Sequence, residues 1–192
     1  MANNTKNIMI VGVGGQGTLL ASRILGNAVI SKGYDVKVSE VHGMSQRGGS
    51  VVTYVKFGDA VHSPIIDKGE ADIILAFECL EAYRALPWLK KGGKMIVNDQ
   101  MINPMPVITG AASYPEELDT KMAAAGINLD AFDALALAEE AGNAKAVNLV
   151  LLGRISKYFD FTDEEWMDAI EKSVPAKFLE LNKKAFELGK NA

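Results

Sequence analysis

The sequence predicts an α/β fold: a Rossmann-like three-layer sandwich with a mostly parallel sheet, an interrupted second half and C-terminal helices. Three observations predict it. Short β-branched runs alternate with helical apolar spacing, a glycine-rich turn joins the first strand to the first helix, and a capping box introduces the helical end. With 192 residues, 48% of them hydrophobic, the chain can bury one substantial core. We therefore expect a single domain over 1–192, with an α/β core over 1–159 and C-terminal helices over 160–192.

The first strand, turn and helix are the most informative segment. The apolar run at 8–11 leads into Gly12-Val13-Gly14-Gly15-Gln16-Gly17 and then into a helix from about 16 to 32, which Gly33 ends. Glycines in such a turn let backbone amides approach a phosphate, and a helix N-terminus favours negative charge. The turn therefore predicts a binding site for cofactor phosphates, unless it is needed only for packing. The candidate residues are Gly12, Gly14, Gly15, Gln16, Gly17 and Thr18.

The second strand, over 34–39, ends at Glu40, where a dinucleotide-binding fold places an acid that accepts hydrogen bonds from a ribose. The next segment departs from the dehydrogenase pattern, because a loop and an extended run over 51–57 replace the second crossover helix. Arg47, flanked by glycines in this loop, is suited to hold a carboxylate or phosphate with both arms of its guanidinium, or to pin the loop against an acid. His42 either shuttles a proton or has a structural role. These two are the candidate catalytic side chains.

Strand and helix patterns alternate again after residue 70. We expect strands over 73–76, 94–98 and 128–132, and helices over 80–86, 116–125, 134–141 and 146–159. The run Lys91-Gly92-Gly93 predicts a turn before the strand at 94. Two prolines in Asn103-Pro104-Met105-Pro106-Val107 restrict that segment to an edge strand or an extended connector.

The C-terminal section begins with Thr162-Asp163-Glu164-Glu165, a capping box that starts a helix running to about Ser173. Pro175 separates it from a last helix over 176–188. The two helices either close the core of the domain or present Trp166 and Phe186 to a partner.

Charge and composition exclude several classes of protein. The net charge of −4 and pI near 5.3 give no basic face for nucleic acid. We expect no membrane span and no leader peptide, hence a cytoplasmic protein. The single cysteine, Cys79, rules out an intrachain disulfide and a cluster held by four cysteines of this chain, and we expect no metal here. Cys79 is either a small buried hydrophobe or a thiol activated at a helix N-terminus.

Two motifs carry a resemblance to a known family. The turn over 11–17 and the segment Glu40-Val41-His42-Gly43-Met44-Ser45-Gln46-Arg47-Gly48-Gly49-Ser50-Val51 resemble the gamma-type subunits of 2-oxoacid:ferredoxin oxidoreductases, and within them the small (beta) subunits for indolepyruvate. The likeness continues through 64–66, 71–75, 92–93 and 148–153. It implies oxidative decarboxylation of indolepyruvate or other arylpyruvates to aryl-acetyl-CoA, with ferredoxin as electron acceptor. Pyruvate, 2-oxoglutarate and branched-chain 2-oxoacids are the alternative substrates.

The resemblance also implies where the cofactors lie. Thiamine diphosphate, magnesium and 4Fe-4S clusters would belong to a large (alpha) subunit, because this chain has no thiamine-diphosphate motif and no set of cysteine ligands. The chain would be inactive alone, would reach ferredoxin through the complex, and in isolation would have a surface suited to a homodimer. The glycine-rich turn then contacts coenzyme A or the partner, and Glu40 has no ribose to bind.

The same resemblance implies a loop that faces the active site or the partner, at the carboxyl ends of the strands. Its residues are His42, Gly43, Met44, Ser45, Gln46, Arg47, Gly48, Gly49 and Ser50. Two other classes stay open: an NAD(P)-dependent enzyme that uses Glu40, and a nucleotide-binding regulatory module that uses the turn over 12–17.

Overall fold

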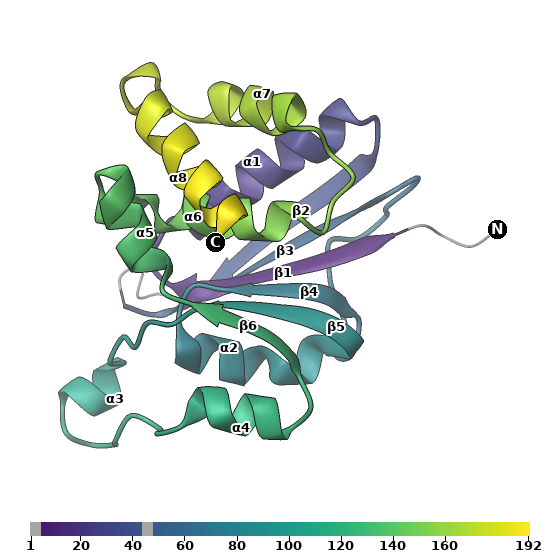
Figure 1. The fold of residues 1–192 in the computed structure, drawn as a ribbon. Helices are drawn as coiled ribbons and strands as arrows, with labels where there is room; N and C mark the ends of the chain where they lie inside the picture. The colour runs from purple at the N-terminus through teal and green to yellow at the C-terminus, as the bar shows by residue number, and fades with distance from the viewer. Residues whose placement is uncertain (1–4, 44–47) are drawn as a thin grey trace.

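A six-stranded sheet forms the middle of three layers in the computed structural model, which describes residues 5–43 and 48–192 (Figure 1). In the order β2-β3-β1-β4-β5-β6, its strands are β1 (Lys6–Val13), β2 (Asp35–His42), β3 (Ser50–Gly58), β4 (Ala71–Ala76), β5 (Leu89–Asn98) and β6 (Asn128–Phe132). β1, β4, β5 and β6 pair in parallel, whereas β3 is antiparallel to both β1 and β2. The predicted α/β fold with a mostly parallel sheet is confirmed.

Helices cover both faces of the sheet (Figure 1). One face carries α1 (Thr18–Ser31), α5 (Ala134–Ala141), α6 (Val147–Ser156), α7 (Asp163–Ser173) and α8 (Leu179–Asn191). The other face carries α2 (Cys79–Ala85) and α4 (Leu118–Ala124), with α3 (Met105–Ile108) beyond the carboxyl ends of the strands. Short 3-10 turns are η1 (Leu86–Trp88), η2 (Ala144–Ala146) and η3 (Ala176–Phe178). Each face therefore has its own hydrophobic core.

β1 lies in the middle of the sheet and is buried on both faces. Ile8 and Ile10 belong to the core under α1, and Met9 and Val11 to the core under α2. A strand buried on both sides has no polar face, which explains its uninterrupted apolar sequence. The glycine-rich turn follows β1 and therefore lies at the carboxyl ends of the central strands.

β3 is inserted between β1 and β2, which would be neighbours in a standard dinucleotide-binding unit. The register pairs Val13 with Ser50 on one side of β3 and His42 with Val51 on the other. The expected interruption of the second half thus takes the form of an antiparallel strand that fills the middle of the first βαβ unit. It moves the end of β2 away from the glycine-rich turn by about one strand spacing, roughly 5 Å.

The C-terminal helices complete the core. The backbone N–H of Thr162 donates to Glu165 Oε2 at 2.7 Å, and the N–H of Glu165 donates to Thr162 Oγ1 at 3.3 Å, so the predicted capping box is present. Trp166 and Phe186 are 1% and 0% exposed. The core-closing interpretation is confirmed, and the alternative that these rings face a partner is wrong.

Two local predictions need correction. The segment Asn103–Val107 is not an edge strand: Pro104 is extended, and the single turn α3 begins at Met105. Proline is compatible with a first helical turn, because the N–H that it lacks would have no helical partner there. The predicted turn Lys91-Gly92-Gly93 is a bulge inside β5, where Ala71 pairs with Leu89 but Ile73 with Lys94.

Candidate functional site

The side chain of Gln16 closes the glycine-rich turn. Its Oε1 accepts a hydrogen bond from the Val13 N–H at 2.7 Å, and its Nε2 donates to the Phe77 carbonyl at 3.0 Å. A Cβ on Gly12 would lie 2.8 Å from Gln16 Oε1 and 3.0 Å from Phe77 Cβ. Gly12 and Gln16, both predicted to bind a cofactor, therefore hold the turn against the end of β4, while the backbone around them stays accessible.

Gly17 is the N-cap of α1 and has a left-handed backbone, with φ 87° and ψ 24°. A Cβ there would meet the Asn148 amide nitrogen at 2.7 Å. That amide donates to the Gly17 carbonyl at 3.4 Å, and Asn148 Oδ1 accepts from the Leu149 N–H at 3.0 Å. The buried Asn148 amide of α6 thus fixes the start of α1. Because its nitrogen and its oxygen both have hydrogen-bond partners, burying this amide costs little free energy.

Several backbone N–H groups of the turn and of the start of α1 have no hydrogen-bond partner in the described part of the chain. The N–H groups of Gly15, Gly17, Thr18 and Leu19 donate to no residue that the structure describes. Gly14 differs, because its N–H donates to the Gly49 carbonyl at 2.9 Å. Donors at the N-terminus of a helix attract anions, since the helix dipole adds partial positive charge. Backbone in this turn is therefore suited to bind a phosphate or a carboxylate.

Two hollows adjoin these donors. One, of about 430 Å³, is bounded by the turn together with Glu40, His42 and Val51. The other, of about 400 Å³, lies between the turn, Gln100 and Lys145. Lys145 is the middle residue of η2 and forms no ion pair with a described residue. Sequence reasoning missed it, because nothing in its neighbourhood of the chain indicates that it lies beside the glycine-rich turn.

Glu40 and His42 lie in the first hollow with different partners from those predicted. Glu40 Oε2 accepts a hydrogen bond from Thr53 Oγ1 at 3.3 Å. Because β3 separates β2 from β1, Glu40 lies one strand further from β1 than the ribose-binding acid of a standard dinucleotide-binding unit, and its role as a ribose ligand stays a prediction. His42 is exposed, with Nδ1 3.3 Å from the Gly43 carbonyl. The predicted loop residues Met44, Ser45, Gln46 and Arg47 lie outside the described residues, so their role stays a prediction.

The far end of the predicted loop is anchored to α2. Ser50 Oγ donates to Glu81 Oε2 at 2.5 Å, and Arg84 Nη1 lies 2.6 Å from Glu81 Oε1. The Glu81 carboxylate is buried, whereas the Arg84 side chain is 52% exposed. Gly48, Gly49 and Ser50 share a third hollow, of about 270 Å³, with this arginine. A guanidinium has five N–H donors, so Arg84 retains capacity for an anionic ligand.

A buried carboxylate organises the segment after β5. Glu78, 1% exposed, is the N-cap of α2 and accepts hydrogen bonds from the Glu81 N–H at 2.9 Å, from the Ile102 N–H at 3.0 Å and from the Tyr114 hydroxyl. Burial and the Glu78 carboxylate raise the pKa of Tyr114. Sequence reasoning missed this clamp, because Tyr114 contacts Glu78 from 36 residues away.

Cys79 is a buried thiol. It lies 3.8 Å from the Asn98 carbonyl and 3.6 Å from Asp99 Oδ1. Burial raises the pKa of Cys79 to about 12, and the Asp99 carboxylate acts in the same direction. The thiol therefore stays protonated near neutral pH, and the interpretation as a small hydrophobe is confirmed. A protonated, buried and solitary cysteine does not fit an iron-sulfur cluster.

Apolar side chains are exposed around the same end of the sheet. Each of the following is at least half exposed: Leu19, Val41, Met101, Met105 and Ile108. They come from α1, β2 and the segment after β5; Leu19 lines the first hollow, and Met105 lines the third. Exposed apolar groups gathered at one place are typical of a protein interface. None of the described helices has the length and apolar character needed to cross a bilayer.

Comparison with known proteins places this arrangement in a family. The family model "Pyruvate ferredoxin/flavodoxin oxidoreductase" matches residues 7–192. The chain belongs to this family. Among its relatives, the indolepyruvate oxidoreductase subunits IorB of Thermococcus kodakarensis and Pyrococcus horikoshii are each 46% identical, over 97% of this chain and 95% of theirs. The gamma subunit of a keto/oxoacid ferredoxin oxidoreductase from Geobacter sulfurreducens superposes with a TM-score of 0.72 and 26% identity, over 97% of this chain and 96% of the other. The resemblance found in the sequence is confirmed.

Proposed function

We propose that this chain is the small subunit of an indolepyruvate:ferredoxin oxidoreductase and is active only in complex with a large subunit. The 46% identity to two indolepyruvate oxidoreductase subunits, over 97% of the chain, carries the proposal. The reaction is the oxidative decarboxylation of indolepyruvate or related arylpyruvates to an aryl-acetyl-CoA, with ferredoxin as electron acceptor. Because such chemistry is oxygen-sensitive, the proposal implies an anaerobic cytoplasm.

Within the complex, the redox groups belong to the partner. Cys79, the single cysteine of the chain, is buried and protonated, and the sequence has no thiamine-diphosphate motif. We therefore assign thiamine diphosphate, magnesium and the 4Fe-4S clusters to the large subunit. The exposed apolar residues around the three hollows support docking of that subunit at the carboxyl ends of the strands. We further propose that residues 1–192 act as one domain, because α7 and α8 bury their aromatic side chains in the shared core.

The contribution of this chain to chemistry is to bind coenzyme A. The N–H groups of Gly15, Gly17 and Thr18, which donate to no described residue, suit a phosphate, and Lys145 supplies a side-chain cation beside them. Coenzyme A supplies the thiol that accepts the acyl group. The residues of this chain hold and orient it, and the neighbouring loop over 42–50 covers the partner's active site.

The first experiment is anaerobic reduction of a viologen dye by indolepyruvate with thiamine diphosphate and coenzyme A. It compares this chain alone, the co-purified large subunit alone, and the two together. We expect activity only in the reconstituted pair, with indolepyruvate preferred over pyruvate, 2-oxoglutarate and 2-oxoisovalerate. Full activity of the large subunit alone would refute the subunit role.

The coenzyme A contact has its own test in the reconstituted pair. We expect Lys145→Ala to raise the KM for coenzyme A by about threefold to tenfold, which corresponds to the loss of one charge-assisted contact, with little change in the KM for indolepyruvate. The matched control is Lys172→Ala, an exposed lysine on α7. Arg47→Ala in the same assay tests the predicted loop. Binding of a nicotinamide cofactor that Glu40→Gln abolishes would instead favour the NAD(P)-dependent alternative.

A further inference from the structure

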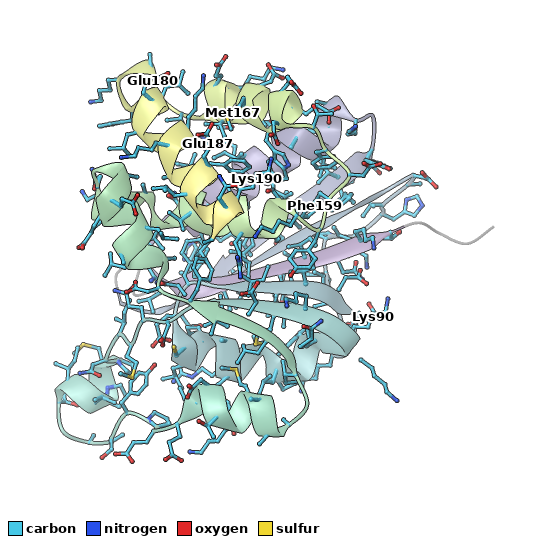
Figure 2. All side chains as sticks on the ribbon, viewed as in Figure 1. Lys90, Phe159, Met167, Glu180, Glu187 and Lys190 are labelled. Carbon is cyan, nitrogen blue, oxygen red and sulfur yellow. The ribbon has the colours of Figure 1, made fainter. Side chains whose placement is uncertain are left out.

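A hollow of about 620 Å³ lies at the end of the sheet opposite to the glycine-rich turn. It opens where β1, β4 and β5 begin, under the segment that joins α6 to α7. Figure 2 shows Phe159 on that segment, on the α1 side of the sheet, and Lys90 at the beginning of β5. The candidate site described above does not use this end of the molecule.

The inner surface of the hollow is apolar and largely aromatic. Ile8, Ile73 and Phe57 are its buried residues. The Phe57 ring is stacked on Phe159, with centroids 5.9 Å apart, and is 5.9 Å from the tilted ring of Tyr34. Tyr158 and Phe161 line the same space. The volume is that of a small-molecule pocket, and the apolar side chains form its inner wall.

The rim of the hollow is basic, although the chain as a whole has a net charge of −4. The charged residues that line the hollow are five lysines and two aspartates: Lys6, Lys32, Lys90, Lys91, Lys94, Asp72 and Asp160. Lys90 pairs with Asp72 at 2.9 Å, and Lys32 with Glu165, also at 2.9 Å. Three of these lysines, Lys6, Lys91 and Lys94, form no ion pair with a described residue. Lys94 Nζ donates to Asn128 Oδ1 at 3.0 Å and lies 5.8 Å from the centroid of the Tyr158 ring. The surplus of positive charge favours an anionic ligand.

The bulge in β5 contributes to this rim. The shift in pairing between Ala71 and Ile73 leaves residues 90–93 outside the regular ladder with β4. This places the consecutive lysines 90 and 91 beside the opening rather than in a regular strand. A bulge re-aims side chains at a sheet edge, and such bulges are common next to binding sites.

We propose that this hollow is a second binding site, which takes an aromatic carboxylate: its ring stacks against Tyr158 and Phe159, and its carboxylate faces Lys6 and Lys91. The proposal is independent of the subunit role, because it concerns the opposite end of the sheet. An aromatic acid needs an apolar slot and a nearby cation, and the hollow supplies both. A nucleotide would also need groups that read the edge of its base, and the rim offers mainly ammonium groups.

The test is calorimetric titration of the purified full chain with indole-3-acetate as probe. We expect saturable binding of one molecule per chain with a Kd below about 1 mM. Indole-3-acetamide, which keeps the ring and removes the charge, should bind at least about tenfold more weakly, a loss equivalent to one charge-assisted contact. Added salt should weaken the binding of the acid but not of the amide.

Variants locate the site. Tyr158→Ala removes an exposed aromatic wall without changing the core, and Lys6→Gln with Lys91→Gln removes two of the three lysines without an ion pair; each is expected to weaken binding by at least about fivefold. The matched controls are Tyr83→Ala, an exposed tyrosine on α2, and Lys172→Gln on α7, which should leave the Kd unchanged. Lys145→Ala, at the glycine-rich turn, should also leave it unchanged.

Four results would overturn the proposal: no saturable binding up to several times 1 mM, equal affinity for the acid and the amide, tighter binding of adenosine monophosphate than of the acid, or sensitivity to Lys145→Ala but not to Tyr158→Ala. The last result would place the probe at the glycine-rich turn. Because the titration uses the isolated chain, failure of the reconstituted oxidoreductase assay does not affect its outcome.

Discussion

The contact between Gly17 and Asn148 allows a quantitative prediction about the glycine-rich turn. Gly17→Ala places a methyl group on a left-handed backbone with φ 87°, at 2.7 Å from the Asn148 amide nitrogen. The backbone conformation alone costs roughly 1–2 kcal/mol for a residue other than glycine. Displacing Asn148 also weakens its bond to the Gly17 carbonyl, which is worth about 1 kcal/mol. We expect a total loss of about 2–3 kcal/mol in the free energy of unfolding.

Unfolding in urea measures this loss, and a double-mutant cycle separates its two parts. In an Asn148→Ala background the contact is absent, so Gly17→Ala should cost only the backbone part, about 1–2 kcal/mol. Gly15→Ala is the control, because Gly15 also has a left-handed backbone, with φ 101°, but has open space around it. Its cost should be the same with or without Asn148. If Gly17→Ala and Asn148→Ala are additive within about 0.5 kcal/mol, the contact does not constrain the turn.

Two further predictions concern the core. The pKa of Cys79 in the folded chain, about 12, lies above its ordinary value of 9.0, so stability that is present below pH 9 is lost as the pH rises toward 12. Between about pH 8 and pH 10 the wild type should therefore lose about 1 kcal/mol more unfolding free energy than Cys79→Ala; equal slopes for the two proteins would contradict this. Arg154 makes two bonds to Asp130, at 2.9 and 2.8 Å, with side chains 19% and 13% exposed, so Arg154→Ala should cost about 1–3 kcal/mol. The exposed pair of Lys172 provides the comparison, because Lys172→Ala should change stability by less than about 0.5 kcal/mol; chemical denaturation of both variants checks the ranking.

The elements that the sequence predicted well are those set by local interactions. The helix at 134–141 and the strand at 128–132 have the predicted bounds, and the capping box at Thr162 starts α7. Each of these follows from side chains within a few residues of one another, which a single sequence contains. The interruption after Glu40 was also predictable, since a strand pattern replaced the second helix.

The errors arose where a distant segment decides the local conformation. The expected position of Glu40 beside β1 assumed that β1 and β2 are neighbours, but β3 enters the sheet between them. The glycines at 92–93 suggested a turn, yet pairing with β4 keeps them within β5 as a bulge. Hydrophobic periods of 2.0 and 3.6 residues identify strands and helices but do not indicate which strands pair. The insertion of β3 and the bulge in β5 therefore could not be predicted from these patterns.

The candidate site shows the same division. The glycine-rich turn was found because its residues are contiguous, whereas Lys145 and the Glu78–Tyr114 clamp join it from remote segments. The basic, aromatic hollow is the extreme case, since residues from 6 to 161 build it. No short stretch of the sequence contains enough of that hollow to reveal it.

The hydrogen bond from the Gly14 N–H to the Gly49 carbonyl couples the position of the glycine-rich turn to that of the end of the loop over 42–50. Ser50, next in the chain, is in turn held by Glu81. A ligand that binds and orders the glycine-rich turn therefore also favours one position of Gly49 and Ser50. A subunit that binds the loop in that position favours the same geometry of the turn. Thermodynamic linkage requires the two effects to be equal in size. On the proposed binding of coenzyme A to this turn, coenzyme A should strengthen subunit association by the same factor by which association strengthens the binding of coenzyme A.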